Sequence, residues 1–223
     1  GVLLRQRVPH YGIGGAQPAP VLENYLNFTM PNGGTVTLTR NGSPTVVELE
    51  YSLDNQQTWT DWQEVGNVRS LTLTAGQKVF IRNTSATPTG FSTDGPHYYR
   101  FGFVGTVEAS GNCNSLLCKH PNNVITIPHF AFYVLFYACT SLTLSDGFIL
   151  TASILSSSSY RAMFNGCVLV NKIRTLMTDI SANDCLAGWL DNVSSTGDFY
   201  CDQNLTIQTG GSGIPSGWTR HDI

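Results

Sequence analysis

Thr35-Val-Thr-Leu-Thr39 alternates polar and apolar residues, and the later stretch Arg69-Ser-Leu-Thr-Leu-Thr74 repeats that alternation. In an extended chain this pattern gathers the apolar side chains on one face, which is typical of a half-buried strand. Residues 46–51, 78–82 and 101–107 are predicted as further strands, separated by turn-forming residues such as Asn41-Gly42. The spacing of these turns predicts a small antiparallel β-sandwich over residues 24–111.

A repeat appears after residue 112. Leu135-Phe136-Tyr-Ala-Cys139-Thr-Ser-Leu142 recurs, with one constant offset at every matched position, as Met163-Phe164-Asn-Gly-Cys167-Val-Leu-Val170, and a weaker third copy, Trp189-Leu190-Asp-Asn-Val193, follows at a similar interval. Repeats of about 20–29 residues that carry a strand and a short helical turn are typical of leucine-rich-repeat solenoids. We therefore predict a short leucine-rich-repeat-like α/β solenoid over residues 112–223. Its repeat core is predicted to consist of Leu135, Phe136, Cys139, Leu142, Met163, Phe164, Cys167 and Val170.

Charged residues are scarce, and the first residues carry no long apolar run. The 223 residues include 12 Lys and Arg against 15 Asp and Glu, a formal net charge of −3. A nucleic-acid partner requires a basic surface, so we expect none. The apolar run 130–137 is far shorter than the ~20 residues of a membrane span, so we expect no membrane insertion. Residues 1–23 are Gly- and Pro-rich from residue 12 on and are predicted to form a leader arm or linker.

Six cysteines lie at positions 113, 118, 139, 167, 185 and 201. Cys139 and Cys167 occupy the same repeat position, so both are expected to point inward on neighbouring rungs. Rungs about 4.8 Å apart permit a disulfide, but a small apolar thiol satisfies the packing of a stacked ladder by itself. Of the two alternatives we favour buried free thiols.

The Phe-x-x-Cys-x-x-Leu repeats, followed by Val193-Ser-Ser-Thr-Gly197-Asp-Phe199 and Gly213-Ile-Pro-Ser-Gly-Trp-Thr219, resemble BspA-like leucine-rich-repeat proteins of gut Bacteroidales and of the phages that infect them. Upstream, Asn24-Tyr-Leu-Asn-Phe28 and Tyr51-Ser-Leu-Asp-Asn55 resemble the β module that precedes such repeats. The resemblance covers residues 24–219 and implies surface display and binding. Short versions without a signal peptide resemble phage virion components, and displayed phage proteins of this kind are often homotrimers.

Ser52-Leu-Asp54-Asn-Gln56-Gln-Thr58-Trp59 nearly matches an Asp-box, with Gln56 at the glycine position. Asp-boxes are frequent in sialidases, but the motif itself ties a hairpin turn, and a sialidase needs several copies. The sequence contains no Gly-x-Ser-x-Gly elbow, His-Glu-x-x-His or P-loop. Cys113 and Cys118 with His120 lack the second close pair of ligands of a structural zinc site. We expect no enzymatic activity, no cofactor and no metal, with a glycan-acting enzyme as the minority alternative.

Exposed aromatic side chains are the candidate ligand contacts, because a sugar ring stacks on them. The candidates are Trp59, Trp62, Tyr98, Tyr99 and Trp218. The leading expectation is a structural or receptor-binding protein displayed on a phage virion, in contact with a host-surface glycan or protein, or with other virion proteins. The alternative is an exported bacterial cell-surface adhesin.

Overall fold

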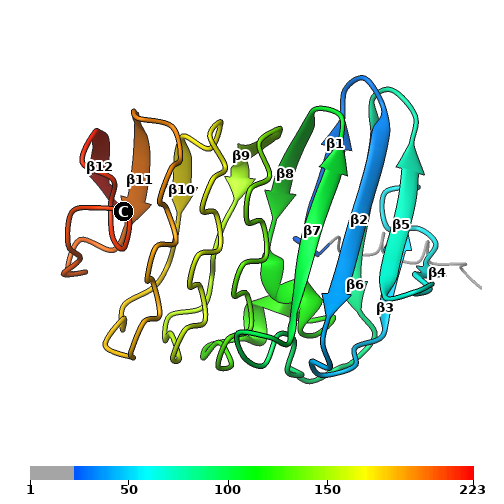
Figure 1. Cartoon of the computed structure of the whole chain (residues 1–223), viewed down its shortest axis with the longest axis horizontal. Helices are drawn as coiled ribbons and strands as arrows, with labels where there is room; N and C mark the ends of the chain where they lie inside the picture. Colours follow the sequence, from blue (N-terminus) through cyan, green and yellow to red (C-terminus); the bar gives the residue numbers. More distant parts are fainter. Residues whose placement is uncertain (1–22) are drawn as a thin grey trace, which may run out of the picture.

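The computed structural model of the protein describes residues 23–223 (Figure 1). The predicted leader arm, apart from Glu23, lies outside the described residues. The strands are β1 (Asn27–Met30), β2 (Gly34–Asn41), β3 (Leu49–Ser52), β4 (Thr60–Asp61), β5 (Val68–Leu73), β6 (Gln77–Asn83), β7 (Tyr98–Val104), β8 (Val107–Gly111), β9 (Leu142–Phe148), β10 (Lys172–Arg174), β11 (Gly197–Cys201) and β12 (Trp218–Asp222). The helices of this part are the short 3-10 turns η1 (Cys113–Leu116) and η2 (Pro121–Asn123). Within residues 23–223, no helix has the length and apolarity to span a membrane.

Two sheets form the two layers of the first half. One has the strand order β4-β3-β6-β1-β8-β9, and the other has the order β5-β2-β7. Val36 and Leu38 of β2 are buried while the threonines beside them face outward, as the alternation predicts. Phe28 of β1 meets Phe101 of β7 edge to face, with ring centroids 5.0 Å apart, so the core lies between the sheets. The predicted mainly β fold with antiparallel sheets is confirmed.

The first layer continues beyond residue 111 as a row of parallel strands. β8 pairs in parallel with β9, and β10, β11 and β12 form a parallel sheet of their own. A bridge between Leu150 and Thr175 links the segment after β9 to the segment after β10. Figure 1 shows β8 to β12 side by side in one row, from green to red. β8 belongs to both parts of this layer, since it pairs antiparallel with β1 and parallel with β9.

The second layer continues as stacked turns, which we call the turn ladder: residues 130–139, 158–167 and 184–193. Backbone hydrogen bonds join it to the sheet and join its rungs to one another. The N–H of Phe101 donates to the carbonyl of Leu135 (2.8 Å), Phe136 donates to Met163 (2.9 Å), and Phe164 donates to Trp189 (3.0 Å). The second and third of these bonds join copies that the repeat in the sequence predicts to lie on neighbouring rungs, whereas the first joins the ladder to β7.

The helical turn expected in each repeat is wrong for the described chain. Every fourth residue of the ladder has a positive φ, at positions 130, 134 and 138, then 158, 162 and 166, then 184, 188 and 192. A left-handed residue interrupts an α-helix, so each rung is instead a succession of turns such as Tyr133 N–H to Phe130 C=O (3.0 Å). Other N–H groups of each rung then point along the stack and bond the next rung.

One hydrophobic core fills the space between the layers throughout residues 23–223. The rings of Phe101, Phe136 and Phe164 stack in a column at centroid distances of 5.4 Å. All eight predicted repeat-core residues are buried: Leu135, Phe136, Cys139, Leu142, Met163, Phe164, Cys167 and Val170. The six cysteines are buried and unpaired with one another. The Cys167 thiol donates to the carbonyl of Phe136, 2.9 Å away, so Cys167 bonds back to the preceding rung.

Candidate ligand-binding groove

Two of the five predicted ligand contacts, Trp62 and Tyr99, belong to the interior. Their exposed fractions are 3% and 0%. The Tyr99 hydroxyl donates to the carbonyl of Thr45 (3.0 Å), and its ring stacks against Phe91 at 4.3 Å. The Trp62 carbonyl accepts a 2.9 Å hydrogen bond from the buried guanidinium of Arg69. Neither ring is available to a ligand.

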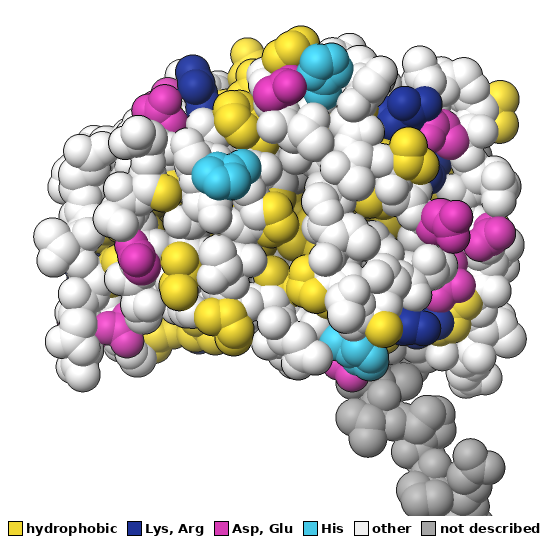
Figure 2. Space-filling view, turned by 90° about the horizontal axis from the view of Figure 1, so that it is seen from below, with side chains coloured by type: hydrophobic (Ala, Val, Ile, Leu, Met, Phe, Trp, Pro, Cys, Tyr) yellow, Lys and Arg dark blue, Asp and Glu magenta, His cyan; other side chains and the backbone are white. Residues whose placement is uncertain are grey.

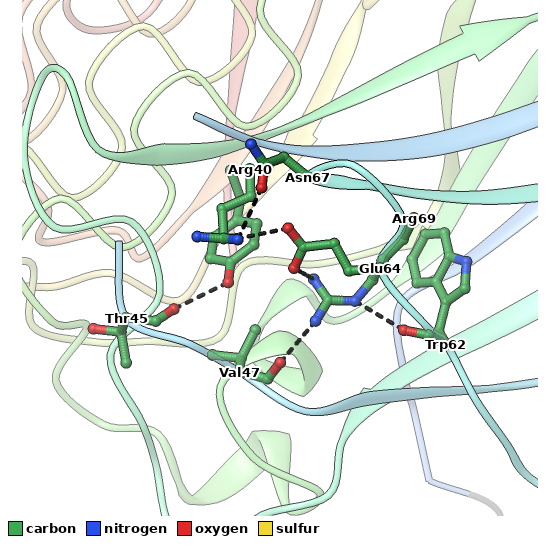
Figure 3. A network of polar contacts seen from close by, with 8 residues as sticks. Arg40, Thr45, Val47, Trp62, Glu64, Asn67 and Arg69 are labelled. Atoms are coloured by element: carbon green, nitrogen blue, oxygen red, sulfur yellow. Dashed lines mark hydrogen bonds and ion pairs between the residues drawn. The ribbon is translucent and has the colours of Figure 1, made fainter. Parts of the chain in front are cut away.

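Arg69 is held in a network of charges at this end of the sandwich (Figure 3). Its guanidinium also donates to the carbonyl of Val47 (2.8 Å) and lies 3.7 Å from Glu64, whose other carboxylate oxygen is 2.7 Å from Arg40. Figure 3 shows Glu64 between the two arginines. Because a buried guanidinium needs a charged partner, Glu64 makes the burial of Arg69 possible, and the network fixes the loops around Trp62.

Trp218 is also a packing residue. It is 8% exposed, and its indole N–H donates to the carbonyl of Ser194 (2.8 Å). The ring lies over Gly197 of the neighbouring strand so closely that a β-carbon on Gly197 would stand 2.7 Å from it. Trp218 therefore closes the core at the last strand and does not offer its ring face to solvent.

Trp59 is half-buried and follows the Asp-box turn. The Arg82 guanidinium stacks on its ring at 3.7 Å, and Tyr25 meets it edge to face at 5.3 Å. In the turn, Asp54 accepts hydrogen bonds from the Thr58 hydroxyl (2.6 Å) and the Thr58 N–H (2.9 Å), and these bonds lower the pKa of its carboxyl to about 2. The motif therefore closes a hairpin, in agreement with its structural interpretation.

Gln56 occupies the glycine position of that turn with a φ of +68°. Its side-chain amide bonds the backbone of Glu23 twice, accepting from the N–H (3.1 Å) and donating to the carbonyl (2.8 Å). A glycine has no such side chain, so the departure from the Asp-box pattern fastens the start of the described chain to the hairpin.

Tyr98 is the predicted contact that lies in a groove. The groove is on the outer face of β2 and β7, has a volume of about 260 Å³, and is lined by Thr39, Asn41, Tyr98, Arg100, Phe101 and Gly102. Tyr98 and Arg100 point outward because they alternate with the buried Tyr99 and Phe101. Their cross-strand partners on β2 are Asn41 and Thr39. Gly102 leaves the floor hollow, since a β-carbon there would lie 2.8 Å from the Thr37 hydroxyl.

Two tyrosines of the first rung of the turn ladder lie beside this groove, in contact with Tyr98 and Arg100. Tyr133 meets Tyr98 edge to face at 5.7 Å, and the Arg100 guanidinium lies 5.1 Å above the ring of Tyr137, which is 39% exposed. We call these residues the tyrosine groove: Thr39, Asn41, Tyr98, Arg100, Gly102, Tyr133 and Tyr137. Sequence reasoning found Tyr98 alone. The same-face spacing of Tyr98 and Arg100 was a usable signal, whereas the approach of Tyr133 and Tyr137 depends on long-range pairing.

The tyrosine groove offers aromatic rings, hydroxyls, one amide and one guanidinium. These groups bind polar ligands with ring-shaped apolar faces, and none of them is an ordinary proton-transfer group at neutral pH. The molecule carries few charges elsewhere on its surface: on the face seen in Figure 2, backbone and uncharged polar side chains predominate.

A larger hollow lies elsewhere, at the far end of the stack. It has a volume of about 720 Å³ and lies between residues 178–187 and residues 204–212. The last turn of the chain is shorter than the one before it. The chain uses fewer residues between Gly197 of β11 and its partner Trp218 on β12 than between Lys172 of β10 and its partner Asp198 on β11. The lining contains no aromatic residue, which distinguishes this hollow from the tyrosine groove.

Comparison with known proteins gives no match: no protein-family model, no curated protein and no solved structure is similar to this chain at a significant level.

Proposed function

We propose that this protein is a non-enzymatic glycan-binding module and that the tyrosine groove is its binding site. The observation that supports the proposal most is the meeting of Tyr98, Arg100, Tyr133 and Tyr137 at the junction of β7 and the turn ladder. Partly exposed rings accept the C–H face of a sugar, and the hydroxyl, amide and guanidinium groups beside them bond its hydroxyls. A small number of polar groups around apolar faces is the usual composition of a ligand site.

The proposal also includes the fold of the second half of the chain and the location of the protein. We infer that the parallel strands and turns form a short leucine-rich-repeat-like solenoid of the BspA kind, and that the protein is displayed on a phage virion to contact a host-surface glycan. The regular recurrence of the repeat and its buried Phe and Cys positions support this inference, together with the resemblance in sequence. An exported bacterial adhesin would use the same groove in another location.

The binding site is tested with the full chain on a glycan array. We expect retention of a subset of glycans, and Tyr98→Ala should weaken the binding about tenfold or more. Gly102→Val should fill the groove once the Thr37 hydroxyl turns away from the new β-carbon, and circular dichroism checks that the variant is folded. Tyr200→Ala is the matched control, since Tyr200 stacks on His221 (4.6 Å) on the outer face of the other layer.

Binding that both groove variants leave unchanged would place the site elsewhere, and the absence of any bound glycan would reject the function. The location is tested by mass spectrometry of purified phage particles and of outer-membrane fractions. Peptides of this chain in particles support virion display, whereas peptides confined to the membrane fraction support the adhesin.

A further inference from the structure

Arg100 differs from most arginines of the described chain in having no acidic partner. Five others lie 2.7–3.7 Å from a carboxylate oxygen: Arg40, Arg69, Arg82, Arg161 and Arg220. Within residues 23–223, Arg100 forms no ion pair and no side-chain hydrogen bond, and Arg174 shares this property on the opposite layer. A guanidinium that folding leaves unpaired inside a groove keeps its full hydrogen-bonding capacity for a ligand.

The position of Arg100 restricts what it recognises. Its guanidinium carbon lies over the ring of Tyr137, 5.1 Å from the centroid, a cation–π contact that uses none of the guanidinium N–H groups as hydrogen-bond donors. Thr39 stands opposite it on β2, and Tyr98 lies two residues before it on the same face of β7. The edge of a held guanidinium is a planar fork that matches a carboxylate with two parallel hydrogen bonds.

The size and charge of the groove exclude a polyanion. Arg100 is the one cationic side chain among the residues of the tyrosine groove, and a nucleic acid requires many neutralised phosphates. A volume of about 260 Å³ falls below the range of roughly 300–1,000 Å³ for drug-sized ligands, so it holds a single ring rather than a chain segment.

We propose that the tyrosine groove recognises an acidic sugar, with Arg100 paired to the carboxylate and the rings of Tyr98 and Tyr133 against the sugar. This inference rests on the proposed glycan-binding function and adds to it the class of the recognised unit. Thr39 pairs with Arg100 across the two strands, and Asn41 pairs with Tyr98. The Asn41 NH2 donates to the Pro96 carbonyl (3.0 Å), so the Asn41 side-chain oxygen and the Thr39 hydroxyl are the groups that can bond the ring hydroxyls of the same unit.

The test is calorimetric titration of the full chain with glucuronate, galacturonate and N-acetylneuraminate, each beside its own methyl ester. The methyl ester keeps the sugar ring and removes the negative charge. We therefore expect at least one acid to bind about tenfold more tightly than its ester, because only the acid forms a charged hydrogen-bonded pair with Arg100. Arg100→Gln should abolish that preference, and Arg100→Lys should restore part of it, because a lysine supplies charge without the planar fork. Arg174→Gln, a second unpaired arginine stacked on a tyrosine, is the control and should leave the preference intact.

The outcomes separate this inference from the function on which it rests. Equal binding of every acid and its ester, or an acid preference that survives Arg100→Gln, overturns the acidic-sugar assignment while glycan binding stands. Retention of neutral glycans on the array with no binding of the three acids overturns it as well. No binding to any array glycan or acid rejects both the function and the assignment.

Discussion

The backbone N–H of Phe101 donates a 2.8 Å hydrogen bond to the carbonyl of Leu135, and this bond attaches the three-stranded sheet to the turn ladder. The Phe101 ring meanwhile stacks on Phe136 at 5.4 Å, so the same junction is fixed in the backbone and in the core. On its outer side it holds Tyr98 and Arg100 against Tyr133 and Tyr137. The geometry of the tyrosine groove is therefore a consequence of how two stretches distant in the sequence are packed.

The continuous core predicts that the chain unfolds as one unit. Phe136→Ala removes the middle ring of the Phe101–Phe136–Phe164 column and should lower the free energy of unfolding by about 3–5 kcal/mol. Val168→Ala, at an exposed position, should change it by less than about 0.5 kcal/mol. Urea unfolding followed by circular dichroism and by tryptophan fluorescence should give coincident transitions for the wild type. Two separated transitions would show that the halves fold independently.

The left-handed positions of the turn ladder predict an unusual pair of substitutions. Gly166 has a φ of +81° and Ala162 a φ of +52°. Gly166→Ala should destabilise the protein by about 1–2 kcal/mol, because an L-residue there adopts a strained conformation and its β-carbon would meet the Ala138 backbone at 3.2 Å. Ala162→Gly should be neutral or stabilising, since it relieves the same strain. Urea midpoints measure both, and the reverse order of stability would contradict the assignment of the turns.

The Asp54 carboxylate predicts an acid-dependent loss of stability. Its pKa in the folded state, about 2, lies below the value of about 3.9 for an unfolded aspartate. A lowered pKa contributes stability that is fully present above the unfolded value and is lost as the pH falls through about 4 toward 2. The melting temperature of the wild type should fall as the pH is lowered from about 4 toward 2, and Asp54→Asn should make this fall smaller. Asp61→Asn, at an exposed residue outside the turn, should leave the decline unchanged, and an equal effect of both variants would contradict the role of Asp54.

The cysteines predict resistance to thiol reagents. All six are buried, and burial raises the pKa of each thiol, that of Cys139 to about 12. A thiolate is the reactive form, so the folded protein at pH 8 should consume almost no aromatic disulfide reagent, whereas the protein in concentrated urea at the same pH should consume six equivalents. Fewer than six equivalents after unfolding without reductant would reveal a disulfide and contradict the free thiols.

Local patterns in the sequence predicted what depends on local geometry. The alternation at 35–39 and 69–74 identified β2 and β5, and the Phe-x-x-Cys spacing gave the offsets of the turn ladder. The helical turn was predicted wrongly because left-handed residues such as Phe130 and Val134 are not glycines, so nothing in the sequence marks them. Their conformation is imposed by hydrogen bonds to the next rung, an effect that only the stacked structure contains.

The residues of the candidate site were harder to predict from the sequence, because their placement also depends on long-range packing. Tyr98 and Tyr99 are adjacent and chemically identical, and which of them faces the core depends on the side of β7 that meets β1 and the ladder. Buried Trp62 donates its indole N–H to the carbonyl of Ser70 and accepts a hydrogen bond from Arg69, which lies 3.7 Å from Glu64, and no spacing rule indicates these partners. Arg100 meets Tyr137, and Tyr98 meets Tyr133, only because the first rung of the turn ladder packs beside β7.

The left-handed residue at every fourth position of the turn ladder also governs how such a chain changes its size. Adding or losing one or two residues within a rung would shift these positions out of line with the neighbouring rung and disconnect their hydrogen bonds. A complete turn, from one rung to the equivalent position of the next, keeps the alignment and lengthens the stack by one strand spacing, about 4.8 Å. We therefore expect the fold to tolerate changes of length in whole turns, and turns added or removed toward β12 should leave the tyrosine groove, at the other end of the ladder, unmoved.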